Sequence, residues 1–268
     1  YNNAQVYGSA KVFGKAQVYC NAHVFGKAQV YDNARVYGNA KIVGHAKVFG
    51  NAEVYGHACI LGNAKVYGSA KVSGDAQVFG NACVHGYSQV YDLAAIHSNA
   101  KVSDDAEVYG NAKVYGNAQV YDSAEVYGNS YVCGNAEICE HAWVLDDAMV
   151  CDDAMIYGNA KVYGCAQVLG NAKICDNAEV FYGAKVYGNA KVYENAKVYG
   201  CAQVYENAQV YGHAHIGCNA KVYGNAQVSD NAEVYGYADV CGNASINGDA
   251  EIDSHSKGYD NADIPAEE

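Results

Sequence analysis

The apolar positions of this chain follow a six-residue rhythm. Every sixth residue from Val6 to Ile252 is valine or isoleucine, without an insertion or a deletion. The residue two positions earlier is alanine, replaced by serine at Ser88 and Ser130. A residue that is mostly lysine, glutamine or glutamate separates the two. This alternation has the period of a β-strand whose alanine and valine lie on the same side.

The residues between these apolar pairs predict corners. An aromatic residue, most often tyrosine, follows the valine, and glycine and asparagine come next. Glycine and asparagine adopt positive φ most easily and therefore turn the chain. Each hexapeptide thus predicts a strand of about four residues followed by a corner. A helix is excluded because glycine recurs every six residues and the apolar positions form no 3.6-residue stripe.

Such short strands need copies of themselves to bury their apolar side. We therefore expect the hexapeptides to stack as a solenoid, with valine over valine and alanine over alanine at a spacing of about 4.8 Å. Each buried valine contributes about 1.5–3 kcal/mol relative to exposure. Much of this offsets the entropy lost when its hexapeptide becomes ordered. Stability is then spread over many interfaces between neighbouring coils.

The repeat resembles the hexapeptide-repeat family, whose fold is the left-handed parallel β-helix. The segment Val114-Tyr115-Gly116-Asn117-Ala118-Gln119 has the aliphatic and small residues of the family motif, and departs from it at the tyrosine. The resemblance implies an all-β, single-stranded left-handed parallel β-helix (β-solenoid) of about 15 triangular coils, each of three hexapeptides and without inserted loops. A flat, two-sided solenoid with a 12-residue coil is the alternative, because replacements of glycine recur at that spacing too.

The period weakens after Ile252, where Gly258 occupies a valine position. We therefore divide the chain into a repeat domain, residues 1–253, and a frayed last repeat with an acidic tail or cap, residues 254–268. Residues 261–264 recover one more repeat before Pro265.

Composition and charge narrow the classes of function. The net charge of −12 disfavours binding to nucleic acid or to anionic membranes. No apolar run approaches the roughly 18 residues that span a bilayer. The eleven cysteines have no paired spacing, which favours free thiols over a disulfide framework. We expect a soluble protein; the compartment stays open, and a structural role at the cell surface or outside the cell is one option.

The family that the sequence resembles includes acyltransferases and a class of carbonic anhydrase. The acyltransferases place a catalytic histidine near a loop between coils, and the anhydrases bind zinc through three histidines, two of them five residues apart. Here no loop interrupts the repeat, and none of the nine histidines has that spacing. We therefore lean against an enzyme, and we predict no catalytic residue, no cofactor and no metal.

One acidic cluster is a weaker candidate for calcium. At 18 residues per coil, Asp104, Asp122 and Glu140 stack on one corner, and Glu107 and Glu125 lie on the strand beside it. Carboxylate oxygens are the ligands that Ca²⁺ prefers. The favoured interpretation is that the acids simply replace glycine at a turn.

Tyrosine is the most abundant aromatic residue and forms a stripe at 18-residue spacing. Stacked rings stabilise a column of this kind by about 0.5–1.5 kcal/mol per pair. Exposed aromatic stripes also mark contact surfaces, here for another solenoid or for the flat faces of sugars. The tyrosines of this stripe are Tyr19, Tyr37, Tyr55, Tyr91, Tyr109 and Tyr127.

A short region places large side chains where the repeat has polar ones. Tyr131, Trp143, Met149 and Met155 occupy the slot of lysine, glutamine or glutamate. Drift within a repeat array explains such changes. An interaction belt for a partner or for self-association is the alternative.

Together these features predict a structural protein. We expect a rigid rod or spacer, part of a longer or self-associating fibre, spike or surface protein, with association end to end or side by side. The first alternative is a module that binds a glycan or a protein partner through the tyrosine stripe. The second is an acyltransferase-like enzyme on the same fold.

Overall fold

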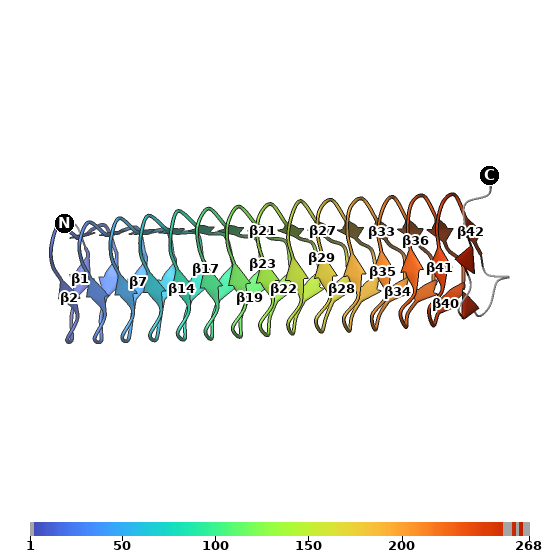
Figure 1. The fold of residues 1–268 in the computed structure, drawn as a ribbon. Coiled ribbons are helices and arrows are strands. Elements are labelled where there is room, and N and C mark those ends of the chain that lie inside the picture. Colours follow the sequence, from blue (N-terminus) through green and yellow to red (C-terminus); the bar gives the residue numbers. More distant parts are fainter. Residues whose placement is uncertain (1–2, 254–258, 261–262, 265–268) are drawn as a thin grey trace. The chain divides into compact units, whose positions relative to one another are not determined.

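The computed structural model describes residues 3–253, 259–260 and 263–264, in which short strands alternate with turns. It consists of two units, unit 1 (Tyr1–Gly134) and unit 2 (Asn135–Glu268). Each unit is a β-solenoid with three parallel sheets, one on each face of a triangular coil (Figure 1). None of the described residues belongs to a helix that is long and apolar enough to cross a bilayer.

The three sheets of unit 1 consist of two-residue strands in chain order. The first sheet contains β1 (Gln5–Val6), β4 (His23–Val24), β7 (Lys41–Ile42), β10 (Cys59–Ile60), β13 (Gln77–Val78), β16 (Ala95–Ile96), β19 (Lys113–Val114) and β22 (Tyr131–Val132). The second sheet contains β2 (Lys11–Val12), β5 (Gln29–Val30), β8 (Lys47–Val48), β11 (Lys65–Val66), β14 (Cys83–Val84), β17 (Lys101–Val102) and β20 (Gln119–Val120). The third sheet contains β3 (Gln17–Val18), β6 (Arg35–Val36), β9 (Glu53–Val54), β12 (Lys71–Val72), β15 (Gln89–Val90), β18 (Glu107–Val108) and β21 (Glu125–Val126).

Unit 2 has the same three faces. Its first sheet contains β25 (Met149–Val150), β28 (Gln167–Val168), β31 (Lys185–Val186), β34 (Gln203–Val204), β37 (Lys221–Val222), β40 (Asp239–Cys241) and β43 (Tyr259–Asp260). Its second sheet contains β23 (Glu137–Ile138), β26 (Met155–Ile156), β29 (Lys173–Ile174), β32 (Lys191–Val192), β35 (Gln209–Val210), β38 (Gln227–Val228), β41 (Ser245–Ile246) and β44 (Asp263–Ile264). Its third sheet contains β24 (Trp143–Val144), β27 (Lys161–Val162), β30 (Glu179–Val180), β33 (Lys197–Val198), β36 (His215–Ile216), β39 (Glu233–Val234) and β42 (Glu251–Ile252).

The register shows that three hexapeptides form one coil. Within each unit the pairings from β1 to β42 join residues 18 apart, as in Ile96↔Val114. The flat solenoid with a 12-residue coil is therefore wrong, and the expectation of triangular coils is confirmed. The geometry is consistent with a left-handed parallel β-helix of about 14 turns in all, close to the expected 15.

The strands are shorter than the four residues that the sequence predicts. Regular strand geometry is confined to the polar residue and the valine, because the corner begins directly after the aromatic residue. The backbone of the aromatic residue still joins the ladder: Tyr7 N donates to Val24 O at 3.1 Å, and Gln5 N donates to Ala22 O at 2.9 Å.

The interior consists of the predicted alanine and valine rows. From Ala22 to Val240 the alanines and the valines or isoleucines of these rows are 0% exposed. Two serines replace alanine in the rows and differ from each other. Ser88 Oγ donates to His85 O at 2.7 Å, whereas Ser130 Oγ is buried without a hydrogen-bond partner. The core is thus a dry, narrow column of small aliphatic groups.

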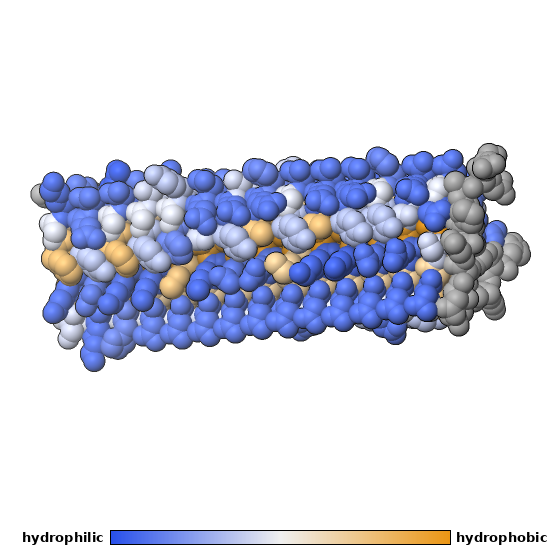
Figure 2. Space-filling model, in the orientation of Figure 1, coloured by the Kyte–Doolittle hydropathy of each residue, from blue (hydrophilic) through white to orange (hydrophobic). Residues whose placement is uncertain are grey.

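The outer surface is mostly polar, with apolar groups between hydrophilic ones on the visible face (Figure 2). The corner asparagines form ladders of their own: Asn63 Nδ2 donates to Asn81 Oδ1, and Asn81 Nδ2 to Asn99 Oδ1, both at 3.1 Å. Such ladders add hydrogen bonds along the stacking direction.

The last two described strands differ in their register. β43 pairs with β40 as Val240↔Tyr259, one residue beyond the regular register, whereas β44 restores it as Ile246↔Ile264. The predicted tail or cap falls largely on residues 254–258, 261–262 and 265–268, which lie outside the described residues.

The cysteines agree in part with the expectation of free thiols. Nine are free, and the other two, Cys133 and Cys151, are disulfide-bonded.

Candidate functional site

Aromatic side chains stack in columns at the corners of the coils. Tyr19 and Tyr37 stack with ring centroids 5.0 Å apart and planes 6° apart, and Tyr37 and Tyr55 stack in the same way. Further along the chain, Tyr91 and Tyr109 lie 4.8 Å apart, and the ring of Tyr127 follows at 4.7 Å. The 18-residue spacing thus places the predicted tyrosines in two face-to-face stacks of three rings, with Ser73 at the position between them.

The hydroxyl groups of three of these tyrosines donate hydrogen bonds to the next coil. Tyr37 donates to Glu53 Oε2 at 3.2 Å, and Tyr109 donates to Glu125 Oε2 at 3.0 Å. Burial and the neighbouring carboxylate of Glu53 raise the pKa of Tyr37 to about 12. Tyr37, Tyr91 and Tyr109 therefore bridge two coils twice, by the ring and by the hydroxyl. These contacts favour the stabilising interpretation of the stripe, while its use as a contact surface stays a prediction.

The sequence analysis singled out one corner, but all three corners carry aromatic columns. In unit 1, Phe13, Tyr31, Phe49 and Tyr67 stack at 4.8–4.9 Å, and His85 continues that column. In unit 2, Tyr187, Tyr205 and Tyr223 form another column. The signal was present in the sequence, since phenylalanine and histidine recur at the same 18-residue spacing. The columns at all three corners become visible in the sequence when tyrosine, phenylalanine and histidine are treated as one class of planar side chain.

The predicted acidic cluster is a hydrogen-bonding feature of the corners. Asp104, Asp122 and Glu140 all have φ near +58°, because they occupy the glycine position of the turn. Glu140 Oε2 accepts a hydrogen bond from Gly158 N at 2.8 Å, and Ser103 Oγ donates to Asp104 at 3.0 Å. The acids thus satisfy polar groups around the corner.

The neighbouring glutamates of that cluster are also engaged. Glu107 accepts hydrogen bonds from Gln89 Nε2 at 2.8 Å and from Tyr91 Oη at 3.0 Å, and Glu125 accepts from Tyr109. The part of the chain that the structure describes contains no group of three or more His, Cys, Asp or Glu side chains that could hold a metal ion. Calcium binding at Asp104, Asp122, Glu140, Glu107 and Glu125 stays a prediction.

The bond that Glu140 accepts from the next coil recurs at many other corners where an acid replaces glycine. Asp92 accepts from Gly110 N at 3.3 Å, Asp146 from Gly164 N at 3.1 Å, and Glu206 from Gly224 N at 2.9 Å. An acid in the left-handed region is strained, and this bond to the next coil compensates for the strain.

The four residues of the interaction belt do not share one face. Within unit 2, Trp143 lies on the third sheet, Met149 on the first and Met155 on the second, and all three are half-buried. Six residues along this chain move a side chain to the next face, so proximity in sequence does not make a patch. Each ring also has a cation nearby: Lys161 Nζ lies 4.5 Å from the ring centroid of Trp143, and Lys113 Nζ lies 5.2 Å from that of Tyr131.

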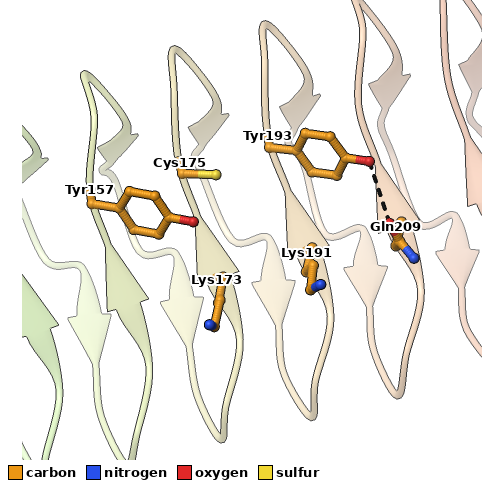
Figure 3. Close-up of a pocket in the computed structure, with 6 residues that line it drawn as sticks. All are labelled: Tyr157, Lys173, Cys175, Lys191, Tyr193 and Gln209. Carbon is orange, nitrogen blue, oxygen red and sulfur yellow. Dashed lines mark hydrogen bonds between the residues drawn. The ribbon is translucent and has the colours of Figure 1, made fainter.

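A pocket lies where one aromatic column is interrupted. In unit 2 the column of the second sheet has Cys175 between Tyr157 and Tyr193 (Figure 3). A pocket of about 290 Å³ opens there, lined by Tyr157, Lys173, Cys175, Lys191, Tyr193 and Gln209. The sequence analysis missed it. The signal was a small residue in a column that is otherwise aromatic on both sides.

A second interruption, at Gly217, is closed. A Cβ atom on Gly217 would lie 2.6 Å from Cζ of Tyr199, so the tyrosine ring covers the glycine. That ring also meets His215 edge to face, with centroids 6.3 Å apart. A missing ring therefore leaves a pocket at Cys175 but not at Gly217.

The comparisons with known proteins agree with the repeat. The family model described as the YdcK beta solenoid repeat matches residues 28–42. Among curated proteins none matches this chain. A solved structure described as a candidate acetyltransferase from Desulfovibrio desulfuricans G20 aligns over 81% of this chain and 65% of that one, with 9% identity and a TM-score of 0.16. This chain thus spans about 65% of that protein's length.

The sheets and the register define the class of protein. The chain is a parallel β-helix of hexapeptide repeats, as the resemblance in its sequence implies.

Proposed function

We propose that this protein is a structural scaffold, a stiff rod or spacer that forms part of a longer or self-associating fibre, spike or surface protein. The unbroken register carries the proposal. No insertion interrupts the repeat from Val6 to Ile252, and within each unit the described strands up to β42 pair at one constant offset. In solenoids and other folds, binding and catalytic residues lie disproportionately on loops. A repeat without loops supplies length and stiffness instead.

The energetics of the solenoid support this role. Each coil adds buried alanines and valines that contact the coils next to it, so stability grows with the number of coils. The edge of a parallel sheet also accepts a further strand, which supports self-association end to end. The aromatic columns are the matching feature for association side by side.

The two alternatives need features beyond the register. A glycan- or protein-binding module needs exposed aromatic ring faces. In the stacked tyrosines much of each ring face is covered by the neighbouring ring. An acyltransferase-like enzyme needs a catalytic group positioned beside an acyl donor. A structural scaffold needs neither exposed aromatic faces nor a catalytic group.

Deletion of one whole coil tests the proposal. Removing residues 91–108 should leave a folded protein, because Val90 and Tyr109 then join in the original phase of all three faces. We expect its maximum dimension in solution scattering to fall by about 4.8 Å. Removing the single hexapeptide 91–96 is the control: it preserves the alanine and valine rows but shifts every later column to another face.

Two outcomes would count against the scaffold. The first is a coil deletion that unfolds the protein. The second is turnover by the intact chain of an acetyl donor such as acetyl-coenzyme A, above the background rate, with amine or alcohol acceptors.

A further inference from the structure

We infer that the interruption at Cys175 is a binding site for one planar aromatic ring that carries an anionic group, such as an aryl carboxylate. The ring would take the place of the missing tyrosine between Tyr157 and Tyr193. This inference goes beyond the scaffold role and does not depend on it.

The spacing of the column fits a single ring. Tyr193 and Tyr211 continue the column with centroids 5.0 Å apart and planes 7° apart. At about 4.8 Å per coil, Tyr157 and Tyr193 stand about 10 Å apart. A ring midway between them lies about 4.8 Å from each, within the usual range for stacked aromatic pairs. Figure 3 shows both tyrosine rings extending in the same direction, with the short side chain of Cys175 between them.

The two rings are held in place before any ligand arrives. Tyr193 Oη donates to Gln209 Oε1 at 3.4 Å (Figure 3). A hydrogen bond with the Cys175 thiol, together with burial, raises the pKa of Tyr157. Burial also raises the pKa of the Cys175 thiol, so the floor of the pocket is uncharged at neutral pH. Side chains that are already ordered reduce the entropy lost on binding.

The size of the pocket limits the ligand. Its volume of about 290 Å³ is at the lower end of the range for small-molecule sites. It therefore suits one ring or a fused pair of rings.

Charge on the face of the sheet selects an anion. Lys173 and Lys191 are direct neighbours in the parallel pair β29–β32, and both line the pocket. Within the described part of the chain, the ammonium group of neither lysine has an ion pair or a hydrogen bond. Two adjacent ammonium groups repel each other, and an anion between them relieves the repulsion.

Negative charge lies on the corner side and is already in use. Asp176 Oδ2 accepts from Glu194 N at 3.0 Å, and Glu194 Oε2 accepts from Gly212 N at 2.9 Å. Asp176 also lies 3.9 Å from the Cys175 sulfur. The anionic group of a ligand is therefore expected over the lysines, with the opposite edge of its ring toward the corner.

The closed interruption at Gly217 shows what the cysteine side chain does. Without a side chain at that position, the ring of Tyr199 covers the backbone and fills the space. At position 175 the Cβ and Sγ atoms occupy this place, so a neighbouring tyrosine ring cannot settle over the backbone. The cysteine thus keeps the pocket open.

Titration of the intact protein with 2-naphthoate, followed by isothermal calorimetry, tests the inference. Cys175→Tyr completes the column and should weaken binding at least tenfold, while the folded state stays intact or becomes more stable. Cys175→Gly should weaken binding several-fold because a tyrosine ring can then cover the position. Cys175→Ser is the matched control and should bind like the original protein.

Charge and planarity are tested separately. Replacing both Lys173 and Lys191 with glutamine should weaken 2-naphthoate binding about tenfold and remove its salt dependence. Cyclohexanecarboxylate, which is not planar, and 2-naphthylmethylammonium, which is cationic, should bind at least tenfold more weakly than 2-naphthoate. No binding of 2-naphthoate at millimolar concentration would overturn the inference, as would binding that Cys175→Tyr leaves unchanged. Equal binding of the three probes would overturn it too.

Discussion

The interior rows and the corner columns come from the same repeat, yet they vary very differently. In the interior, the chain allows one methyl group, as in Ile96 for valine, or one hydroxyl, as in Ser88 for alanine. At the corners, the aromatic position also holds His85, Cys175 and Gly217. Both sets stack on residues 18 apart, so stacking alone does not explain the difference.

The confinement of the interior side chains explains why they vary less than the corner side chains. An interior side chain is 0% exposed and meets the coils on both sides and the other two faces of its own coil. A corner ring is half-buried and contacts mainly its own column. The interior side chains therefore determine the fold, whereas the side chains at the corners can vary. The pocket at Cys175 arises from such a variation at a corner.

The strongest test puts a charge into the interior. Val114→Asp should lower the free energy of unfolding by about 4 kcal/mol or more, because the carboxylate has no partner in a dry core. Lys113→Asp, one residue earlier on the same strand, points outward and should cost only about 1 kcal/mol, because it loses the cation–π contact with Tyr131. Urea unfolding followed by circular dichroism measures both. Similar losses for the two variants would show that the interior is not the constrained region.

A smaller loss is expected at the turns. A Cβ atom on Gly86 would lie 2.6 Å from Asp104 N, whereas one on Gly62 would lie 3.2 Å from Gly80 N. Both glycines have φ near +70°. Gly86→Ala should therefore cost about 2–3 kcal/mol and Gly62→Ala about 1–2 kcal/mol, since the second variant adds to the backbone strain only a tight contact that a small shift of Gly80 relieves. Equal losses in urea unfolding would mean that the contact with Asp104 relaxes freely.

The sequence predicts the features that follow from the regular repeat, namely which side of each strand is buried and which side chains stack. The alternation around Val114 indicates which side is buried, and the 18-residue spacing of Tyr91 and Tyr109 predicts their stacking. Both follow from identical residues in a fixed phase. The length of the strands was overestimated because the corner begins directly after the aromatic residue.

The corners hold what the sequence does not predict. The bond from Gly158 N to Glu140 depends on the distance between two coils, which no local pattern encodes. The open pocket at Cys175 and the closed one at Gly217 look alike in the sequence, since each simply lacks a ring. Which of them stays open depends on where the neighbouring tyrosine settles.

The two interior serines should respond in opposite directions. Ser130→Ala should raise the free energy of unfolding by about 1 kcal/mol, because it removes a buried hydroxyl that has no partner. Ser88→Ala should lower it by about 1 kcal/mol, because the bond to His85 O is lost. Thermal unfolding at one protein concentration compares the two variants. Stabilisation by both would mean that even a satisfied hydroxyl disfavours the interior.

The smallest effect concerns one corner hydroxyl and its pH dependence. The folded protein raises the pKa of Tyr37 to about 12, from an ordinary value near 10. Between these two values the unfolded chain loses the proton and the folded one keeps it, so the contribution of this group is complete below pH 10 and is lost as the pH rises toward 12.

The Tyr37→Phe variant keeps the stacked ring but has no such proton. It should therefore be less stable than the original protein at pH 8, by less than about 1 kcal/mol, through loss of the bond to Glu53. That deficit should shrink between pH 10 and pH 12. Because every other ionisable group is the same in both proteins, the difference in urea midpoints between them reports on Tyr37. A deficit that stays constant from pH 8 to pH 12 would show that folding does not raise the pKa of this hydroxyl, and no deficit at pH 8 would show that the column is held by ring stacking alone.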